Sequence, residues 1–418
     1  RIENTYAKFS KASLSKGLYD SYIRAIRWAS DRIKDCGVIG FVTNGGYIDS
    51  NSADGLRKCL ADEFSSLYFF HLRGNARTSG EQRRKEKDNV FGQGTRTPIL
   101  IAILVKNPNA KQHGQIYFHD IGDYLSREEK LEKISDLVSI NGITTIDGWT
   151  TITPDEHNDW LNQRDDSFSE FIEIGNKKDI TNSLFKNYTN GVVSSRDAFA
   201  YNFSRKNINL IVNDSLKFYS TCIDNNVIDN NPTKISWSVN LKKSFEKKSK
   251  INFNSNEIRV SSYRPFTKSY IYFDKSLIER RNQLPNILPL DNLKNNQILL
   301  SGVGSSKGFS VFITSNLFDF QTLSNCQGFP LYLYEKNTIE STETDLFNEA
   351  ETDTIDGKYT RKDAISDIGL KHFQDSYPNE TISKEDIFYY VYGLLHSEDY
   401  RTRYADNLTK ELPRIPCV

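Results

Sequence analysis

The order of apolar runs within the first 105 residues constrains the fold more than any other feature of the sequence. Three short runs, Val38–Val42, Leu67–His71 and Pro98–Val105, are separated by polar and charged stretches. Runs of this length and composition are typical of strands that are buried on both faces. An open parallel sheet needs more than three strands, so we expect its first strands to lie upstream of Arg1.

Helices are predicted before the first run and between the first two runs. Apolar residues recur at helical spacing across residues 14–35. A second helix has its apolar face at Leu56 and Leu60, with Ser52 or Asp54 as its N-cap. Alternating helices and strands of this kind predict an α/β sheet that is covered by helices on both faces.

The composition of the sequence changes after residue 150, where Asn and Ser become frequent and the apolar segments become short and rich in aromatic residues. We therefore predict a first domain over residues 1–150 and a second, mixed α+β domain over residues 151–418. Ten acidic against four basic residues predict a solvated insertion at about 335–367. Residues 381–412 return to a helical pattern, predicted as a terminal helical hairpin whose first helix begins with a capping box at Ser383–Asp386. The short segments of the second domain are Ser236–Val239, Ser269–Phe273, Gln297–Leu300 and Phe309–Ile313.

Composition narrows the class of protein. The chain has 418 residues with 54 basic and 54 acidic side chains, and no run of eighteen apolar residues. No transmembrane helix or secretory signal is therefore expected. Five cysteines without a C-x-x-C pair favour a reducing, cytoplasmic location. The sequence also contains no methionine, which indicates either an internal piece of a longer protein or methionines omitted from the written sequence.

Several kinds of chemistry are excluded by spacing. In Gly302–Gly308 the lysine precedes the last glycine, so a phosphate-binding Walker loop is not formed. The glycines of Phe91–Gly94 are misplaced for a loop that binds S-adenosylmethionine. Six histidines without clustered spacing predict no metal site, and we assign no catalytic residue to this chain.

Two basic stretches are candidates for contact with nucleic acid, because phosphate binding depends on local charge rather than net charge. Residues 73–96 hold seven basic against three acidic residues, within a predicted loop at 73–89. Lys242–Lys250 holds five lysines against one glutamate. Both stretches are also compatible with ordinary solvated surfaces, and the sequence leaves this alternative open.

Specific motifs point to a family. The first part of the chain resembles the C-terminal half of the catalytic domain of γ-type N6-adenine DNA methyltransferases. The residues that carry this resemblance are Gly37–Ile48, Leu56–Leu60, Val90–Phe91 and Thr97–Lys106. Further stretches resemble Type ISP restriction-modification enzymes: Phe70–Thr78, Asn190–Phe199, Tyr263–Phe266, Glu279–Arg281, Glu385–Gly393 and Leu412–Pro416. This resemblance covers nearly the whole chain.

The resemblance implies a fold and an activity. The fold is α/β, with the C-terminal half of a Rossmann-like methyltransferase sheet followed by a mixed α+β target recognition domain. The activity is that of a bacterial enzyme that binds a specific double-stranded DNA site and methylates adenine N6 with S-adenosylmethionine after base flipping. The family's Asn-Pro-Pro-Tyr-type tetrapeptide and cofactor loop are absent from the sequence and are expected upstream of Arg1. The implied partners are DNA and the remaining methyltransferase, helicase-like and nuclease segments of the same polypeptide, so this chain alone should be inactive.

Within that family the candidate site residues fall into three groups. Thr43, Asn44 and Gly45 follow a strand and are predicted to line the rim of the cofactor or adenine pocket, or else to form a plain turn. The predicted phosphate contacts are Arg73, Arg77, Arg83, Arg84 and Lys85. The predicted base-reading residues are Arg196, Arg264, Arg280 and Arg281. An internal Arg196–Asp197 ion pair and a packing corner at Tyr263–Phe266 are the structural alternatives.

Two other functions stay open at this point. One is a stand-alone specificity subunit that recognises DNA and has no catalytic activity. The other is an α/β enzyme unrelated to DNA, for which the sequence offers no catalytic constellation. A steep loss of duplex affinity with salt distinguishes DNA binding from this last function.

Overall fold

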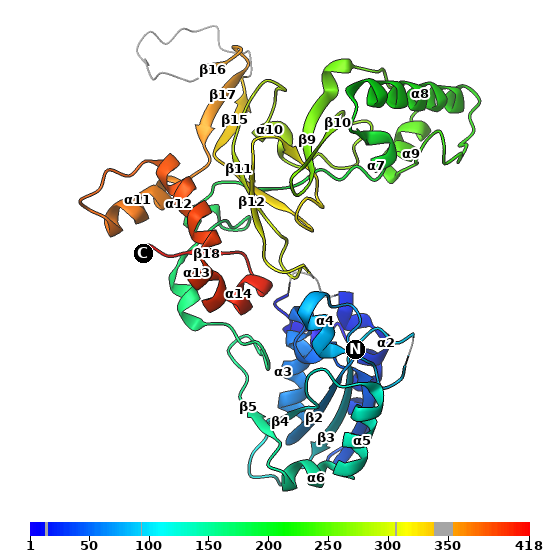
Figure 1. Cartoon of the computed structure of the whole chain (residues 1–418), viewed down its shortest axis with the longest axis vertical. Helices are drawn as coiled ribbons and strands as arrows, with labels where there is room; N and C mark the ends of the chain where they lie inside the picture. Colours follow the sequence, from blue (N-terminus) through cyan, green and yellow to red (C-terminus); the bar gives the residue numbers. More distant parts are fainter. Residues whose placement is uncertain (13–15, 93, 306, 338–353) are drawn as a thin grey trace. The chain divides into compact units, whose positions relative to one another are not determined.

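The computed structural model describes residues 1–12, 16–92, 94–305, 307–337 and 354–418, which form two compact units (Figure 1). Unit 1 is Arg1–Arg164 and unit 2 is Asp165–Val418. The first unit extends past the predicted boundary at residue 150, because the side chain of Trp160 is buried in its core.

Unit 1 is built on one five-stranded sheet with the strand order β1-β3-β2-β4-β5. The strands are β1 (Gly37–Asn44), β2 (Ser66–Arg73), β3 (Ile99–Lys106), β4 (Gln115–Asp120) and β5 (Thr150–Ile152). The three predicted strands are confirmed. The sheet is mixed rather than parallel, since β3 is antiparallel to both β1 and β2, whereas β2 and β4 are parallel. The segment that joins β2 to β3 contains the short helix α4 (Gly80–Glu86), and β3 runs in the direction opposite to β2.

The helices of unit 1 differ in detail from the prediction. They are α1 (Tyr6–Phe9), η1 (Lys16–Tyr19), α2 (Ser21–Arg32), η2 (Gly46–Ile48), η3 (Asn51–Ala53), α3 (Asp54–Glu63), α4 (Gly80–Glu86), α5 (Arg127–Leu137) and α6 (Ile140–Thr145). The predicted helix at 14–35 is split into η1 and α2, and its residues 14 and 15 lie outside the described residues. The predicted loop at 73–89 contains α4.

The predicted N-cap of α3 is wrong. The capping position is Ala53, which offers no side-chain hydrogen bond. The carboxylate of Asp54 instead accepts hydrogen bonds from the Ser10 hydroxyl (2.5 Å) and the Lys11 N–H (2.6 Å). This carboxylate therefore connects α3 to the N-terminal segment rather than capping its own helix.

The two faces of the sheet are covered to different extents. Leu100 and Leu104 of β3 pack in the same core as buried residues of α2 and α3, whereas Ile99 and Ile101 face the other side, toward α5 and α6. β1 pairs with β3 alone among the described strands, and its Val38 and Val42 are 65% and 55% exposed. The prediction that helices cover both faces is therefore wrong at β1, which presents an apolar face to solvent.

Unit 2 contains several small sheets in place of one large sheet. Two have four strands, in the orders β13-β9-β10-β8 and β12-β11-β14-β7; one has three, β15-β17-β16; and β18 pairs with β6. The strands are β6 (Ile172–Glu173), β7 (Thr189–Asn190), β8 (Tyr201–Asn202), β9 (Ile258–Arg264), β10 (Thr267–Tyr272), β11 (Gln297–Leu300), β12 (Val311–Thr314), β13 (Leu317–Phe318), β14 (Gln327–Pro330), β15 (Tyr332–Lys336), β16 (Thr354–Ile355), β17 (Tyr359–Asp363) and β18 (Arg414–Ile415).

Helices flank these sheets. They are η4 (Asp166–Glu170), η5 (Ile180–Asn182), α7 (Asp197–Ala200), α8 (Arg205–Asp224), α9 (Val239–Glu246), η6 (Ser255–Glu257), α10 (Leu284–Ile287), α11 (Asp367–Ser376), α12 (Lys384–His396), α13 (Glu398–Arg403) and α14 (Ala405–Lys410). Ser236–Val239 is not a strand, because the Ser238 hydroxyl caps α9 by accepting a hydrogen bond from the Leu241 N–H. No helix in the described parts of the chain is long and apolar enough to span a bilayer.

Predictions about the C-terminal region can be compared with the described residues. In the acidic stretch at 335–367, β15, β16 and β17 pair, and Lys362 bonds to Glu335 across the strands at 2.5 Å. Residues 338–353 of that stretch lie outside the described residues. The capping box at Ser383–Asp386 is confirmed. The predicted second helix of the hairpin is divided into α13 and α14, because Tyr404 between them has non-helical angles (φ −103°, ψ 24°).

Candidate nucleic-acid interface

The turn after β1 is formed by Thr43, Asn44 and Gly45. The Asn44 side-chain oxygen accepts a hydrogen bond from the Gly46 N–H (3.0 Å), and the Gly45 N–H donates to the Pro98 carbonyl (2.9 Å). A Cβ atom at Gly45 would lie 3.0 Å from Cβ of Leu100, so the close packing favours glycine. These groups bond to Gly46 and to Pro98, and their role at a cofactor pocket stays a prediction.

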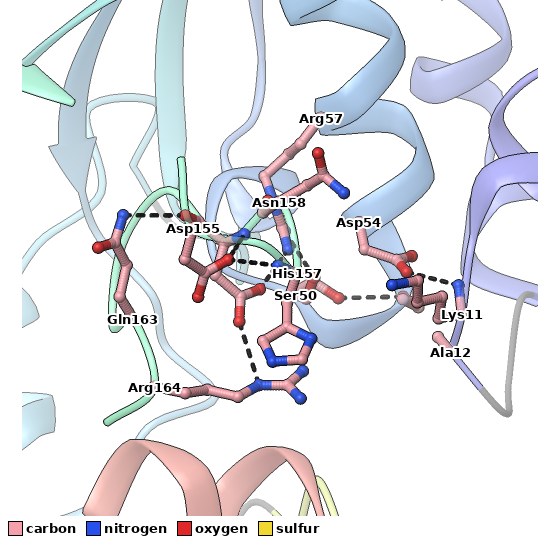
Figure 2. Close-up of polar contacts among 12 residues, drawn as sticks. Lys11, Ala12, Ser50, Asp54, Arg57, Asp155, His157, Asn158, Gln163 and Arg164 are labelled. Carbon is pink, nitrogen blue, oxygen red and sulfur yellow. Dashed lines mark hydrogen bonds and ion pairs between the residues drawn. The ribbon is translucent and has the colours of Figure 1, made fainter. Parts of the chain in front are cut away.

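A buried arginine that the sequence analysis missed supports the segment that follows this turn (Figure 2). Arg57 of α3 is fully buried, and its guanidinium donates to the carbonyl oxygens of Tyr47 (3.1 Å) and Ser50 (2.7 Å). It also donates to the Asn158 carbonyl (2.6 Å) and forms an ion pair with Asp159 (2.8 Å). Burial lowers the pKa of Arg57, and the nearby carboxylates oppose this shift. Arg57 therefore joins the turn after β1 to the segment before the end of unit 1.

The first predicted phosphate contact, Arg73, lies at the C-terminal end of β2 and is engaged internally. Its Nε bonds to Asp120 (2.7 Å) and its terminal nitrogen to Asp123 (2.6 Å). Burial alone would raise the pKa of Asp120, but hydrogen bonds from His71, Arg73 and the Gly122 N–H outweigh it and hold the pKa well below its usual range. Two carboxylates thus neutralise Arg73.

Two buried side chains, Lys130 and Asn89, fix the backbone of the basic segment 73–96 through hydrogen bonds. Lys130 of α5 is fully buried and donates hydrogen bonds to the carbonyl oxygens of Glu86 (3.0 Å) and Asp88 (2.6 Å), just after α4. Burial lowers the pKa of Lys130. The Asn89 amide bonds to the Gly74 carbonyl at 3.2 Å, which closes the base of the segment. A cavity of about 430 Å³ in this segment is lined partly by Arg83, Lys87, Arg96 and Arg127.

The other predicted phosphate contacts lie in or near α4 and differ in exposure. Arg77 is exposed. Arg84 has 74% of its side chain exposed and pairs with Glu81 on the same helix at 2.6 Å. Arg83 donates to the Lys87 carbonyl, and Lys85 lies 3.6 Å from an oxygen of Asp123. The segment therefore presents several cations to solvent, while their contact with phosphate stays a prediction.

In unit 2, Arg196 is a buried side chain that is only 5% exposed. One terminal nitrogen donates to the Ser238 hydroxyl, while Nε and the other terminal nitrogen have no hydrogen-bond partner within the described residues. Burial lowers the pKa of Arg196 to about 10. The alternative Arg196–Asp197 ion pair is wrong, because Asp197 faces Arg264 and accepts a hydrogen bond from the Tyr263 hydroxyl.

Arg264 is held by the residues around it. Its guanidinium donates to Asp319 (2.9 Å), lies 3.8 Å from Asp197 and stacks 3.9 Å from the centre of the Tyr263 ring. Burial raises the pKa of Asp319. The packing-corner interpretation therefore describes the structure around Arg264.

Arg280 and Arg281 are neighbours in sequence but lie in different surroundings. The backbone of Arg280 pairs with Val193, while its side chain is exposed. Arg281 donates to the Phe273 carbonyl (3.3 Å) and packs over the ring of that residue. The pairing of Arg280 with Val193 brings it beside the segment that contains Arg196. Their role in reading bases stays a prediction.

The described residues contain no group of three or more His, Cys, Asp or Glu side chains placed to hold a metal ion. The functional analysis of the sequence also missed Arg57 and Lys130. Leu56–Leu60 stands out for its apolar spacing and its resemblance, and neither basic residue differs in local sequence from an exposed one. No sequence signal marks them, since two partners of Arg57 lie 7 and 10 residues away and the other partners of both residues lie 42 or more residues away.

Comparison with solved structures covers nearly the whole chain. The ATP-dependent Type ISP restriction-modification enzyme LlaBIII bound to DNA is 36% identical, with a TM-score of 0.82, over 99% of this chain and 26% of that one. A nuclease-deletion mutant of the Type ISP enzyme LlaGI in complex with a DNA substrate mimic is 39% identical, with a TM-score of 0.78, over 99% and 37%. The DrdV–DNA complex is 31% identical, with a TM-score of 0.80, over 100% and 39%.

The chain thus spans well under half the length of these relatives. No curated protein matches it. The model of the Type ISP C-terminal specificity domain matches residues 183–418, which are more than half of the chain. The family match and the likeness over the whole chain agree, and the chain belongs to the Type ISP restriction-modification enzymes, with their C-terminal specificity domain at residues 183–418.

Proposed function

We propose that this chain recognises a specific duplex DNA site for a bacterial Type ISP enzyme that methylates adenine N6 there. The observation that carries the proposal is the likeness of 99% of the chain to two Type ISP enzymes whose structures are described as complexes with DNA or a DNA mimic. Both are more than 30% identical to this chain, which is why the activity of the whole enzyme is a reasonable inference.

Within this function, exposure decides which cations meet the DNA. Arg77, Arg84 and Lys85, with Arg83 beside them, contact phosphates and position the duplex. Arg280 is the first choice for base reading, because its backbone is fixed by Val193 while its side chain is exposed. Arg73 and Arg264 support these contacts by shaping the surfaces from which the exposed cations project.

We also propose that unit 1 is one side of a methyltransferase sheet. β1 is eight residues long, uncharged and free of proline, it pairs on one edge with β3, and its Val38 and Val42 are exposed on one face of the sheet. Natural proteins rarely leave such an edge uncovered, because it pairs readily with other strands. Further strands of the same polypeptide therefore pair with β1.

S-adenosylmethionine is the methyl donor implied by the resemblance to N6-adenine DNA methyltransferases. The turn at Thr43, Asn44 and Gly45 does not form a complete site for it, since the Asn44 oxygen accepts a hydrogen bond from the Gly46 N–H and the Gly45 N–H donates to the Pro98 carbonyl. The cofactor is therefore held mainly by residues outside this chain. Target recognition and support of the pocket rim are the tasks assigned to this chain.

Binding is tested with the whole enzyme and duplexes that carry a randomised core. Repeated selection and sequencing is expected to enrich one motif, and affinity for the enriched duplex should fall steeply with salt as counterions are released. A flat salt response together with no enriched motif would favour an α/β enzyme unrelated to DNA.

Methylation is tested on the enriched duplex with S-adenosylmethionine that carries a labelled methyl group. The whole polypeptide should place label on adenine N6, and residues 1–418 alone should not. Label transfer that requires a separately encoded catalytic chain would favour the stand-alone specificity subunit.

A further inference from the structure

The hairpin that joins β9 to β10 ends in an exposed aromatic side chain. Phe266 is 90% exposed, and its backbone has a φ of +59°. A bulky residue rarely adopts this left-handed conformation, which suits glycine or asparagine. Phe266 is therefore unusual in its exposure and in its backbone.

The geometry of the turn explains the backbone conformation but not the choice of residue. Arg264 pairs with Thr267, so Pro265 and Phe266 are the two central residues of the turn. Proline followed by a residue with positive φ is the signature of a type II turn, which favours glycine or asparagine at the second position. Strained positions of this kind gather at functional sites, where the surrounding structure enforces them.

Contacts below the turn fix the strands that carry it, and the Phe266 ring itself packs against Phe312. Arg264 is clamped by Asp319, and the Ser262 hydroxyl bonds to the Thr314 hydroxyl at 2.8 Å, which links β9 to β12. The ring of Phe266 meets the ring of Phe312 edge to face, with centroids 5.3 Å apart. An aromatic group that is oriented before binding loses little freedom when it binds.

We infer that Phe266 is an aromatic wedge that enters a base step of the DNA target. This inference rests on the proposed DNA-recognition function and names a residue that contacts the bases. Every base offers a flat π face, and apolar side chains that enter a base step unstack it and bend the duplex. A ring on a firm, exposed turn is suited to that task.

The surroundings of Phe266 favour DNA over a protein partner. The neighbouring Lys268 is exposed and basic, and Arg264 lies just below the turn. A stable protein interface has an apolar core made of several residues. Here the exposed ring has the Phe312 ring on one side and the basic Lys268 nearby in the chain, an arrangement suited to insertion between bases.

The test uses the whole enzyme and the duplex enriched by selection, with 2-aminopurine placed in turn at its positions. Phe266→Asn removes the ring but suits the left-handed backbone, so the variant should fold at least as well as the natural protein. Phe266→Trp keeps an aromatic ring at the same place. Phe203→Ala removes another exposed phenylalanine of unit 2, 72% exposed, and is the matched control.

Phe266→Asn is expected to weaken binding about tenfold and to abolish the 2-aminopurine fluorescence increase that reports unstacking at one step. Phe266→Trp and Phe203→Ala should retain both signals.

Natural affinity and unstacking in Phe266→Asn would overturn the inference, and the ring would then be available for a protein partner. Weaker binding with unchanged fluorescence would also overturn it, because the ring would then touch DNA without entering a base step. If the natural enzyme enriches no duplex, the proposed function itself fails.

Discussion

The basic segment of unit 1 and the arginines of unit 2 carry the same kind of charge in different surroundings. In the basic segment, Arg77 is exposed and Arg84 has 74% of its side chain exposed. In unit 2, Arg196 is 5% exposed and Arg264 is engaged by Asp319 and the Tyr263 ring. The same residue type thus faces solvent at some positions and supports the fold at others.

The difference shows that proximity in sequence does not determine whether a cation is available to a phosphate. Arg73 belongs to the basic segment, yet Asp120 and Asp123 neutralise it. Arg280 lies in unit 2, yet its side chain is exposed. Carboxylates and carbonyls that fold against a guanidinium decide its role, and most of them are distant in sequence.

The largest effect is expected when a fully buried cation is removed. Arg57→Met removes the 2.8 Å ion pair with the buried carboxylate of Asp159, whose contact with Arg164 is longer (3.4 Å), and three hydrogen bonds to carbonyl oxygens. Loss of one partner of a buried pair costs about 3–5 kcal/mol in the free energy of unfolding. Hydrogen exchange of unit 1 peptides, detected by mass spectrometry, measures this loss.

Lys58→Met is the matched control for this prediction. Lys58 is the next residue of α3 and forms an exposed pair with Asp62, so its removal should cost no more than about 0.5 kcal/mol. Equal losses for the two variants would contradict the distinction between interior and exposed cations.

The sequence predicted the strands of unit 1 that are continuous apolar runs. β1, β2 and β3 are predictable because each contains a short run made up mostly of apolar or aromatic residues. β4 was missed because it is short and polar at both ends, and α4 was missed because its residues are almost all charged or polar. Ser236–Val239 has the residues of a strand, but capping by Ser238 begins a helix there.

The candidate site was less predictable than the fold. The sequence identified the arginines as a residue type that binds phosphate and bases, but it could not identify their partners. Asp120 lies 47 residues from Arg73, and Asp319 lies 55 residues from Arg264. Pairing over such separations depends on the tertiary fold, which local patterns do not encode.

A smaller effect is expected from the ion pair that neutralises Arg73. Asp120→Asn removes a charged acceptor from His71 and Arg73, which should cost about 2 kcal/mol near neutral pH. The pKa of Asp120 is lower in the folded state than in the unfolded chain. Its contribution is therefore complete above the unfolded pKa, near 4, and is lost as the pH falls toward the folded value.

Unfolding of the natural chain between about pH 6 and pH 2 checks this dependence. Asp120→Asn should have a shallower loss of stability on acidification. Asp62→Asn, which changes an exposed carboxylate of α3, should leave the pH profile unchanged. A profile that is identical in natural protein and Asp120→Asn would mean that the Arg73 pair does not stabilise the fold.

Arg280 is expected to affect discrimination between DNA sequences more than stability. In Arg280→Gln the backbone bonds to Val193 remain, so the fold should be intact. Loss of a bidentate base contact should lower the preference for the enriched motif over a single-base variant by about 1–3 kcal/mol. Competition binding with the two duplexes measures this, and Lys275→Gln, at an exposed lysine, is the control.

The smallest effect per residue is expected at the exposed cations of the basic segment. Arg77→Gln with Arg84→Gln should weaken binding to all duplexes by a similar factor, about fivefold, and reduce the salt slope by about two. Lys34→Gln with Lys111→Gln removes two exposed lysines outside the segment and should change neither quantity.

Arg73→Gln should lower stability while leaving the salt slope unchanged, since its charge is already neutralised within the fold. If the salt slope falls more for Arg73→Gln than for the double variant, the choice of phosphate contacts would be reversed. The ion pairs of Arg73 with Asp120 and Asp123 would then have to open when DNA binds, so that Arg73 contacts a phosphate.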